Sequence, residues 1–274
     1  MSGSSFEEYL VKDSVNIGKK DWNSFETSWD FQKHPLLRNV STISEAFAQW
    51  QAECDDRFNQ LKANEEELNR IFIDIYGLQD ELTPEVEDKD VTVRKADLQR
   101  DIKSLLSYAV GCMFGRYSLD VEGLAYAGGE WDSSKYQSYI PDADNVIPIT
   151  DEEYLDDDIV SRLCAWLKAV YGADTLEANL DYIAKVLGNK GSTSREIIRN
   201  YFLKISSRIT ARLTLSLAPA SVRSTGCLTA ASRTASRHWF ICTATRRIPS
   251  ETCVSTTCTR CSVYMNPRST ECRI

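Results

Sequence analysis

The feature that most constrains the fold of this chain is a long helical pattern over Thr42–Leu78. Its apolar residues recur at steps of three, four and seven, which is the spacing of one helix face; they are Phe47, Trp50, Cys54, Phe58, Leu61, Leu68, Phe72 and Ile75. Thr42 with Glu45 predicts a capping box at the start, and Gly77 predicts a left-handed end. A helix of this length spans roughly 50 Å. We therefore expect a strut, with the later segments packed on its far end.

The segments after the strut predict a compact helical unit. Thr83–Lys95 is a charged connector with a candidate short strand at Val91–Val93, and Asp97–Phe114 has the periodicity of a further helix. Three more helices are each opened by a capping box, with a Glu three residues after the cap; the boxes are Thr150/Glu153, Asp174/Glu177 and Thr193/Glu196. The predicted fold class is mainly α, a long helical strut followed by a compact helical unit.

The first forty residues differ from the rest of the chain because they are aromatic and show no clear helical period. Ser2–Val40 contains too many aromatic residues for a flexible tail and too few residues for a core of its own. We expect this segment to be irregular, as the end of something larger. Within it, Lys19-Lys20-Asp21-Trp22 mixes charge with an aromatic ring, as nucleic-acid surfaces do. The alternative is a solvated turn beside a packed Trp22.

The composition changes abruptly near Ile205. Residues 1–205 have a formal net charge of −16, whereas residues 206–274 have a net charge of +8 and contain neither Lys nor Asp. Six of the nine cysteines lie in this second block, and the spacing of Cys258 and Cys261 is that of zinc ligands. Other candidate ligands in the block are Cys253, Cys272 and His238. A small zinc protein is therefore one reading of the tail.

The other reading is that residues 206–274 are translated in a shifted frame. Permissible codons for Ala235–Thr245, shifted by one base, encode GFKALVYMHRY, and those for Val254–Asn266 encode RIDYLHKVQRVYE. Both shifted peptides have the pattern of ordinary globular sequence, and the second has a helical period. We therefore expect a frameshift near residue 205 and a disordered or poorly folded tail at 206–274, without an evolved fold.

Five stretches of the chain carry a resemblance to a known family. They are Asp21–Leu37, Glu65–Val86, Asp101–Asp120, Gly123–Asp132 and Ser194–Lys204. With these stretches the chain resembles the C-terminal part of the PglX family, the adenine-specific DNA methyltransferases of BREX phage-defence systems. The resemblance covers residues 1–205 in frame and most of the tail out of frame.

This resemblance implies transfer of a methyl group from S-adenosylmethionine to N6 of adenine in DNA. Such enzymes need a glycine-rich cofactor loop and an Asn-Pro-Pro-Tyr-type loop that holds the flipped adenine. The chain contains no Asn-Pro-Pro-Tyr sequence, and Gly128-Gly129 follows no strand that opens a helix. We expect the catalytic domain to lie upstream of Met1, so that this chain has no catalytic, cofactor-binding or metal-binding residues and binds no S-adenosylmethionine.

The resemblance also implies a division of the chain. Residues 1–40 form the end of a target-recognition region, residues 41–78 the connecting helix, residues 79–205 a helical C-terminal domain and residues 206–274 the frameshifted tail. DNA, through the parent enzyme, and other BREX components are the implied partners. The acidic balance disfavours a DNA grip by this part alone, which leaves a few candidate DNA contacts at Lys19, Lys20, Lys33 and Arg38.

No apolar run is long enough to span a membrane, and Met1–Leu10 has no signal-peptide pattern, so we expect a cytoplasmic protein. The alternative to a methyltransferase part is a stand-alone helical protein-interaction module. In that reading Trp50 and Phe58 on the strut face a partner helix.

Overall fold

The computed structural model describes the chain at residues 3–153, 155–188, 191–216 and 239–242. Within these ranges the protein is mainly α, as predicted. Its elements, in order, are α1 (Gly3–Asn23), α2 (Ile43–Tyr76), α3 (Leu98–Met113), a 3-10 turn (Ser133–Lys135), β1 (Val146–Ile149), α4 (Ile159–Tyr171), α5 (Leu176–Leu187), α6 (Ser194–Ser216) and β2 (Trp239–Cys242).

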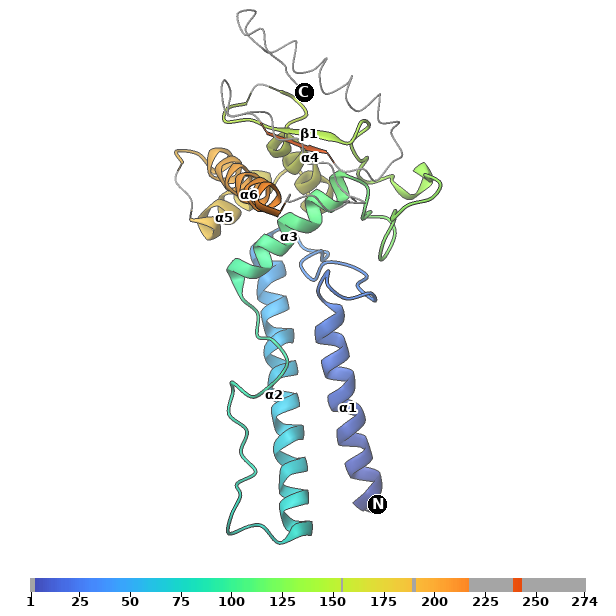
Figure 1. Cartoon of the computed structure of the whole chain (residues 1–274), viewed down its shortest axis with the longest axis vertical. Coiled ribbons are helices and arrows are strands. Elements are labelled where there is room, and N and C mark those ends of the chain that lie inside the picture. The colour runs from blue at the N-terminus through green and yellow to red at the C-terminus, as the bar shows by residue number, and fades with distance from the viewer. Residues whose placement is uncertain (1–2, 154, 189–190, 217–238, 243–274) are drawn as a thin grey trace, which may run out of the picture.

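The molecule has two parts, which we call the stalk and the head (Figure 1). The stalk consists of α1 and α2, which lie side by side and run in opposite directions, and of the segment 79–97, which returns along α2. The head consists of α3 to α6 and β1. It packs on the beginning of α2, where Ile43, Phe47 and Trp50 join the main core. The expectation that the later segments pack on the far end of the strut is therefore wrong.

Helix α2 forms as its sequence predicts. The Thr42 side chain accepts a hydrogen bond from the Glu45 backbone N–H at 3.2 Å, and Gly77 ends the helix with φ of 65°. Trp50 and Phe58 on its apolar face are only 3% and 4% exposed, because other parts of the same chain cover them. They are thus not free to face a partner helix.

The stalk has a small core of its own at mid-length. Ile17 of α1 and Phe58 and Leu61 of α2 meet Val91 and Val93 of the returning segment. The segment 91–93 is not a strand, because it makes no strand pairing. Its two valines are instead buried in this small core. This core is small because one face of two helices encloses little apolar volume.

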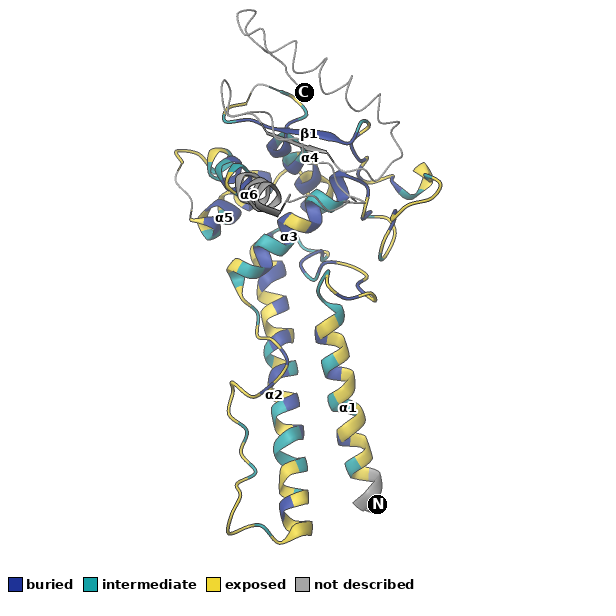
Figure 2. Ribbon diagram, in the orientation of Figure 1, coloured by how far each residue is buried: buried dark blue, intermediate teal, exposed yellow. Residues whose placement is uncertain are grey.

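The expectation of an irregular N-terminal segment is wrong, because Gly3–Asn23 form the helix α1. Its buried residues, Leu10, Ile17 and Asp21, follow steps of seven and four in a helix that is otherwise mostly exposed (Figure 2). Ile17 packs against Phe58 and Leu61 of α2. The helical period is masked in the sequence because apolar residues also stand on the outer face, at Phe6, Tyr9, Val11, Val15 and Trp22. Trp22 is 55% exposed on this helix, so it is not a packed ring beside a turn.

The head differs from expectation at the start of α4. The predicted helix from Thr150 does not begin there, because Val146–Ile149 form the fully buried strand β1 and α4 starts at Ile159. Asp158 caps α4 by accepting from the Ser161 N–H at 2.7 Å. Helix α5 starts at Leu176, and its N-cap residue Thr175 makes no side-chain capping bond, so the Asp174 box is absent.

The remaining helices of the head agree with the sequence. Asp97 caps α3 through the Arg100 N–H, and Thr193 caps α6 through the Glu196 N–H at 3.2 Å. Helix α5 ends at Gly188 in the left-handed conformation, as a glycine stop predicts. The core that these helices enclose includes Trp166, whose side chain is fully buried.

Strand β1 pairs in antiparallel register with β2, with Val146 opposite Cys242 and Ile149 opposite Trp239. Strand β2 and the last part of α6 belong to the 206–274 block. The rest of that block, including the candidate zinc ligands His238, Cys253, Cys258, Cys261 and Cys272, lies outside the described residues. No helix in the described ranges is both long and apolar enough to cross a membrane.

Candidate nucleic-acid interface

The junction between stalk and head is built around the loop 24–42, which joins α1 to α2. The Ser107 hydroxyl of α3 donates a hydrogen bond to Glu26 at 3.3 Å, and the Gly123 N–H donates to the Gln32 carbonyl at 2.7 Å. Within this loop His34 is buried, and its Nδ1 accepts from the Leu36 N–H at 3.2 Å. The loop is thus fixed to α3 and to the segment that follows α3.

The structure separates the four predicted DNA contacts into two kinds. Lys19, Lys20 and Lys33 are exposed. Arg38 is engaged: its guanidinium makes two hydrogen bonds to the Glu53 carboxylate of α2, and its Nε donates to the Pro35 carbonyl at 2.8 Å. These bonds raise the pKa of Arg38 and lower that of Glu53. Arg38 therefore holds the junction loop against α2.

Three arginines that the sequence did not single out gather at the same junction. We call Arg57, Arg94 and Arg100 the arginine cluster. The Arg94 and Arg100 guanidinium carbons lie 4.7 and 5.4 Å from the centre of the Phe25 ring. Arg57 lies 4.6 Å from the Trp50 ring. These residues come from α2, the returning segment and α3, so no local pattern in the sequence brings them together.

Asp21 lies beside the arginine cluster and is only 7% exposed. Burial raises the pKa of this carboxyl, and the nearby Arg57, Arg94 and Arg100 counteract part of that rise. Its Oδ1 and the Arg57 Nε have no hydrogen-bond partner. Arg100 is also paired with the buried Asp101, whose Oδ1 accepts from the Arg100 Nε at 2.7 Å, so two carboxylates face the three guanidinium groups of this corner.

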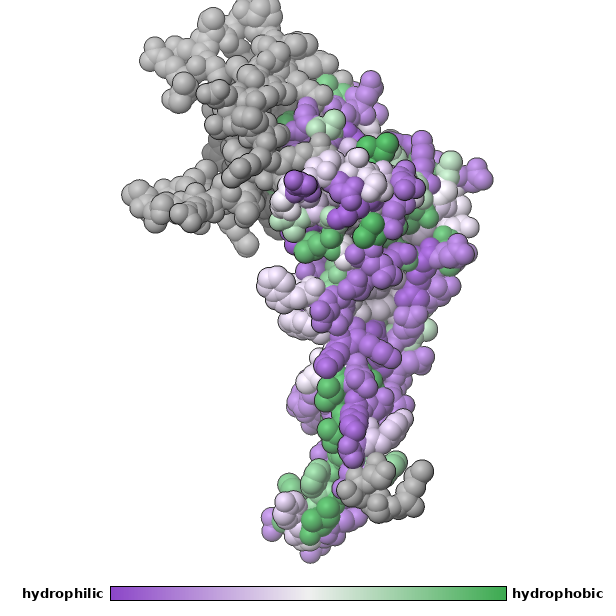
Figure 3. Space-filling model, turned by 90° about the vertical axis from the view of Figure 1, so that its right-hand side faces the viewer, coloured by the Kyte–Doolittle hydropathy of each residue, from purple (hydrophilic) through white to green (hydrophobic). Residues whose placement is uncertain are grey.

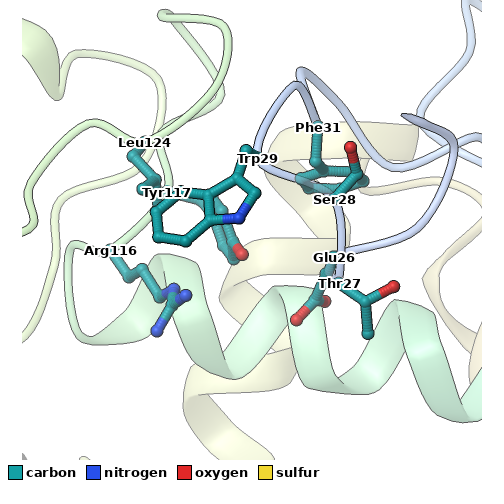
Figure 4. A pocket seen from close by; sticks show the side chains of 8 residues that line it. All are labelled: Glu26, Thr27, Ser28, Trp29, Phe31, Arg116, Tyr117 and Leu124. Atoms are coloured by element: carbon teal, nitrogen blue, oxygen red, sulfur yellow. The ribbon is translucent and has the colours of Figure 1, made fainter. Parts of the chain in front are cut away.

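A pocket of about 200 Å³ opens on the junction (Figure 4). One wall comes from the loop after α1 and the other from the segment after α3. The lining residues are Glu26, Thr27, Ser28, Trp29, Phe31, Arg116, Tyr117 and Leu124. Arg116 is exposed. Sequence reasoning missed the pocket because its two walls are far apart in the chain.

The pocket combines rigid rings with charged groups. Tyr117 stacks on Tyr108 at 4.7 Å between ring centres, and Phe31 meets Tyr117 edge-on at 5.7 Å. Burial raises the pKa of Glu26, while Ser107 and Arg116 counteract it. Such a lining is suited to binding a planar group. Elsewhere in the described residues, no three potential metal ligands of the His, Cys, Asp or Glu type come together.

Comparison with known proteins finds two relatives of known type. No protein-family model matches it. It is 54% identical over 200 residues, 70% of this chain, to the adenine-specific methyltransferase PglX of Lacticaseibacillus casei (strain Zhang). It is 32% identical over 222 residues, 71% of this chain, to the adenine-specific methyltransferase BrxX of Escherichia coli O9:H4 (strain HS).

The chain spans only a small part of these relatives, 17% of PglX and 18% of BrxX. The match is nevertheless strong over most of the chain's own length. The resemblance that the five sequence stretches predicted is therefore confirmed: this chain is similar to one segment of the PglX-type adenine-specific methyltransferases.

Proposed function

We propose that this chain is the C-terminal, non-catalytic portion of an S-adenosylmethionine-dependent, N6-adenine-specific DNA methyltransferase of a BREX phage-defence system, and that it supports recognition of the DNA target. The observation that carries the proposal is the 54% identity to a segment that makes up 17% of PglX. In this chain that segment is a helical head on a two-helix stalk, a shape suited to bracing other parts of an enzyme.

The stalk carries apolar side chains that its own chain leaves uncovered. Phe72, Ile75 and Leu82 near its far end are 50%, 63% and 52% exposed, and Figure 3 shows hydrophobic surface at this end of the molecule. Exposed apolar groups gathered in one place favour contact with another surface. In the proposed enzyme that surface belongs to the recognition region or to the catalytic domain.

The same apolar end favours the second candidate, a helical protein-interaction module. In that case the surface belongs to a separate protein, and the chain acts without a methyltransferase. The two candidates differ in one expected outcome. Only the first predicts that this chain can replace the matching segment inside a PglX enzyme.

DNA contacts in the proposed enzyme fall on the exposed Lys19, Lys20 and Lys33 and on the exposed Arg94. Arg38 is engaged by Glu53, and Arg100 is engaged by Asp101. Each contact with a phosphate adds affinity that salt weakens. The parent enzyme supplies the catalytic domain and the S-adenosylmethionine site, and other BREX components are its proposed protein partners. It acts on DNA in the cytoplasm.

The test is a graft. Residues 1–205 of this chain replace the matching segment of the Lacticaseibacillus casei PglX, and N6-adenine methylation of host DNA is mapped in cells that carry the remaining BREX genes. We expect deletion of the segment to abolish methylation and the graft to restore it at the same sites. A folded graft without methylation would contradict the proposal.

Two controls sharpen this experiment. The double variant Phe72→Ser, Ile75→Ser in the graft should lose methylation, whereas Ile140→Ser, at an apolar residue of the head that is 71% exposed, should keep it. The isolated chain should show no heat of binding when titrated with S-adenosylmethionine. Binding there would show a cofactor site in this chain and overturn the non-catalytic assignment.

A further inference from the structure

The apolar stripe of α2 continues beyond the part of the stalk where it is covered. Phe72 stands fourteen residues after Phe58, and Ile75 stands fourteen residues after Leu61. Fourteen residues are about four turns, so the members of each pair share one face of the helix. At mid-stalk this face is covered by α1 and by the segment 79–97, and Phe58 and Leu61 are 4% and 3% exposed. Near the end of α2 the same face is open, because Phe72 and Ile75 are 50% and 63% exposed. We call this part the open face.

The start of α1 lies level with the open face. The Asn64 amide of α2 donates a hydrogen bond to the Asp13 carboxylate of α1 at 2.8 Å, which sets the register of the two antiparallel helices. Gly3, where α1 begins, and Asp74 are each ten residues from this bond, and both helices rise by about 1.5 Å per residue. In Figure 1 the start of α1 and the end of α2 accordingly lie at the same end of the stalk. A polypeptide that leads into α1 therefore arrives beside the open face.

The surroundings of the open face are strongly acidic. Residues 65–90 contain ten Asp and Glu against one Arg and one Lys, which gives a net charge of −8. Both basic side chains are paired, Arg70 with Glu67 and Lys89 with Glu87. Such a field acts over a Debye length of about 8 Å at physiological salt, which is the distance of direct neighbours. The open face is therefore suited to an apolar surface that is flanked by Lys or Arg.

The same charge argues against three other occupants. A DNA strand would bring its phosphates, and an anionic lipid surface would bring its headgroups. A second copy of this chain would bring another end with a net charge of −8. Each of these places like charges around the apolar contact, which opposes binding. A protein segment with an apolar face and basic flanks does the opposite, and an amphipathic helix presents both on neighbouring surfaces.

Such a helix can belong to the same polypeptide or to a separate protein. The chain spans only 17% of PglX. In the proposed enzyme the rest of the polypeptide precedes this chain and joins it at the start of α1, beside the open face. A segment tethered by a short linker acts at an effective concentration in the millimolar range. A separate protein has no such advantage, so the position of α1 favours the same polypeptide.

We propose that the open face at Phe72 and Ile75 binds the polypeptide that directly precedes this chain in the proposed enzyme, folded as an amphipathic helix with Lys or Arg beside its apolar face. This inference rests on the proposed function for the source of the helix. It deepens that function by naming the partner of the stalk end and the chemistry that holds it. The helix covers the far end of α2 as the segment 79–97 covers its middle.

The test is a photo-crosslink in the graft enzyme. The photoreactive residue p-benzoylphenylalanine replaces Phe72, or Tyr76 in a second protein, and cells that carry the remaining BREX genes are irradiated. Mass spectrometry then identifies the products. The control is the same probe at Ile140 of the head, since Ile140 and Tyr76 are both 71% exposed.

We expect both stalk probes to react mainly with the segment directly upstream of the graft, in a yield about tenfold above that at Ile140. A main product with DNA, with a second copy or with another BREX protein would overturn the proposal. A yield no higher than that at Ile140 would overturn it as well.

Charge variants test the basic flanks of the helix. Asp80→Lys with Glu81→Lys, at two exposed acidic residues of the stalk end, should lower the crosslink yield at Phe72 about fivefold. The matched control, Glu122→Lys with Glu130→Lys, makes the same change of charge at exposed residues of the head and should leave the yield unchanged. Equal yields in the two double variants would overturn the assignment of a basic partner. Circular dichroism of the full chain with each pair of substitutions verifies the fold.

Methylation by the graft is scored separately, so that two kinds of failure can be told apart. A graft that methylates host DNA but gives no upstream crosslink would leave the proposed function in place and overturn this inference. A graft that gives the upstream crosslink but no methylation would support the covering helix and contradict the proposed role in DNA recognition.

Discussion

The Arg199 guanidinium of α6 donates a hydrogen bond to the Asp158 carboxylate at the start of α4, and both side chains are almost fully buried, at 5% and 0% exposure. The other Asp158 oxygen caps α4 through the Ser161 N–H. Arg199 also donates to the Thr150 hydroxyl at 3.2 Å. One buried ion pair thus joins α4, α6 and the end of β1.

Asp158→Ala should destabilise the head strongly. It leaves a buried guanidinium without its charge partner and removes a helix cap, for an expected loss of about 3–5 kcal/mol in the free energy of unfolding. Urea denaturation followed by circular dichroism measures it. The control is Glu177→Ala, which breaks the exposed Arg195–Glu177 pair and should change the urea midpoint little. Equal losses in the two variants would contradict the prediction.

His34 should make stability depend on pH. Burial lowers its pKa to about 3 from the ordinary 6.5, so the folded chain keeps it neutral while the unfolded chain takes up a proton below 6.5. The contribution is complete above pH 6.5 and is lost as the pH falls from 6.5 toward 3. Between pH 7 and pH 5 we expect this group to remove about 2 kcal/mol.

The measurement for His34 is the urea midpoint at pH 7 and pH 5 in the wild type and in His34→Asn. Asparagine can still accept the Leu36 N–H bond that the imidazole Nδ1 accepts, but it does not titrate. The variant should lose less stability than the wild type over this range. An identical loss in both proteins would assign the pH dependence to other groups.

Asn179 of α5 should be needed to start α2. Its side-chain oxygen accepts the Ile43 backbone N–H at 2.8 Å, at the first residue of α2. Asn179→Ala leaves this buried N–H without a partner, at an expected cost of about 1–3 kcal/mol. Thermal unfolding measures it against Asn69→Ala, an exposed residue whose amide bonds the Pro84 carbonyl. Asn179→Ala should unfold at the lower temperature of the two; the opposite order would contradict the prediction.

Gly115 and Gly77 offer a matched pair for the cost of a side chain in the left-handed region. Their φ angles are 74° and 65°, but an added Cβ at Gly115 would stand 2.6 Å from the Trp131 ring, whereas that at Gly77 meets nothing within 4 Å. Both alanine variants share the backbone strain. Gly115→Ala should therefore lose about 1–3 kcal/mol more than Gly77→Ala in urea unfolding, from overpacking. Equal losses would show that Trp131 moves aside freely.

The parts of the fold that could be predicted are those fixed by local patterns. Helix α2 was predictable because its caps and its apolar face agree, from Thr42 to Gly77. Helix α1 was not, because Phe6, Tyr9 and Val15 lie on its outer face and hide the period of the buried residues. A pattern reports amphipathicity only where one face is polar.

The start of α4 shows how tertiary contacts override a capping signal. The Thr150 hydroxyl bonds the Glu152 carbonyl and receives Arg199 from α6, so it does not cap a helix. The candidate site could not be predicted from local sequence patterns, for a similar reason. Glu26 and Arg116 meet only when α3 lies under the junction loop, and no sequence period relates residues that far apart.

The path of the chain through the junction limits how the stalk can change in length. The chain passes between head and stalk three times, leaving α1 for the loop, entering α2 and returning through the segment 79–97 into α3. One extra helical turn in α1 and in α2 adds about 5.4 Å each and must be matched by about two extended residues on the return path. Relatives with longer or shorter stalks should therefore carry matched insertions or deletions in α1, in α2 and in the segment 79–97. The junction should keep its length.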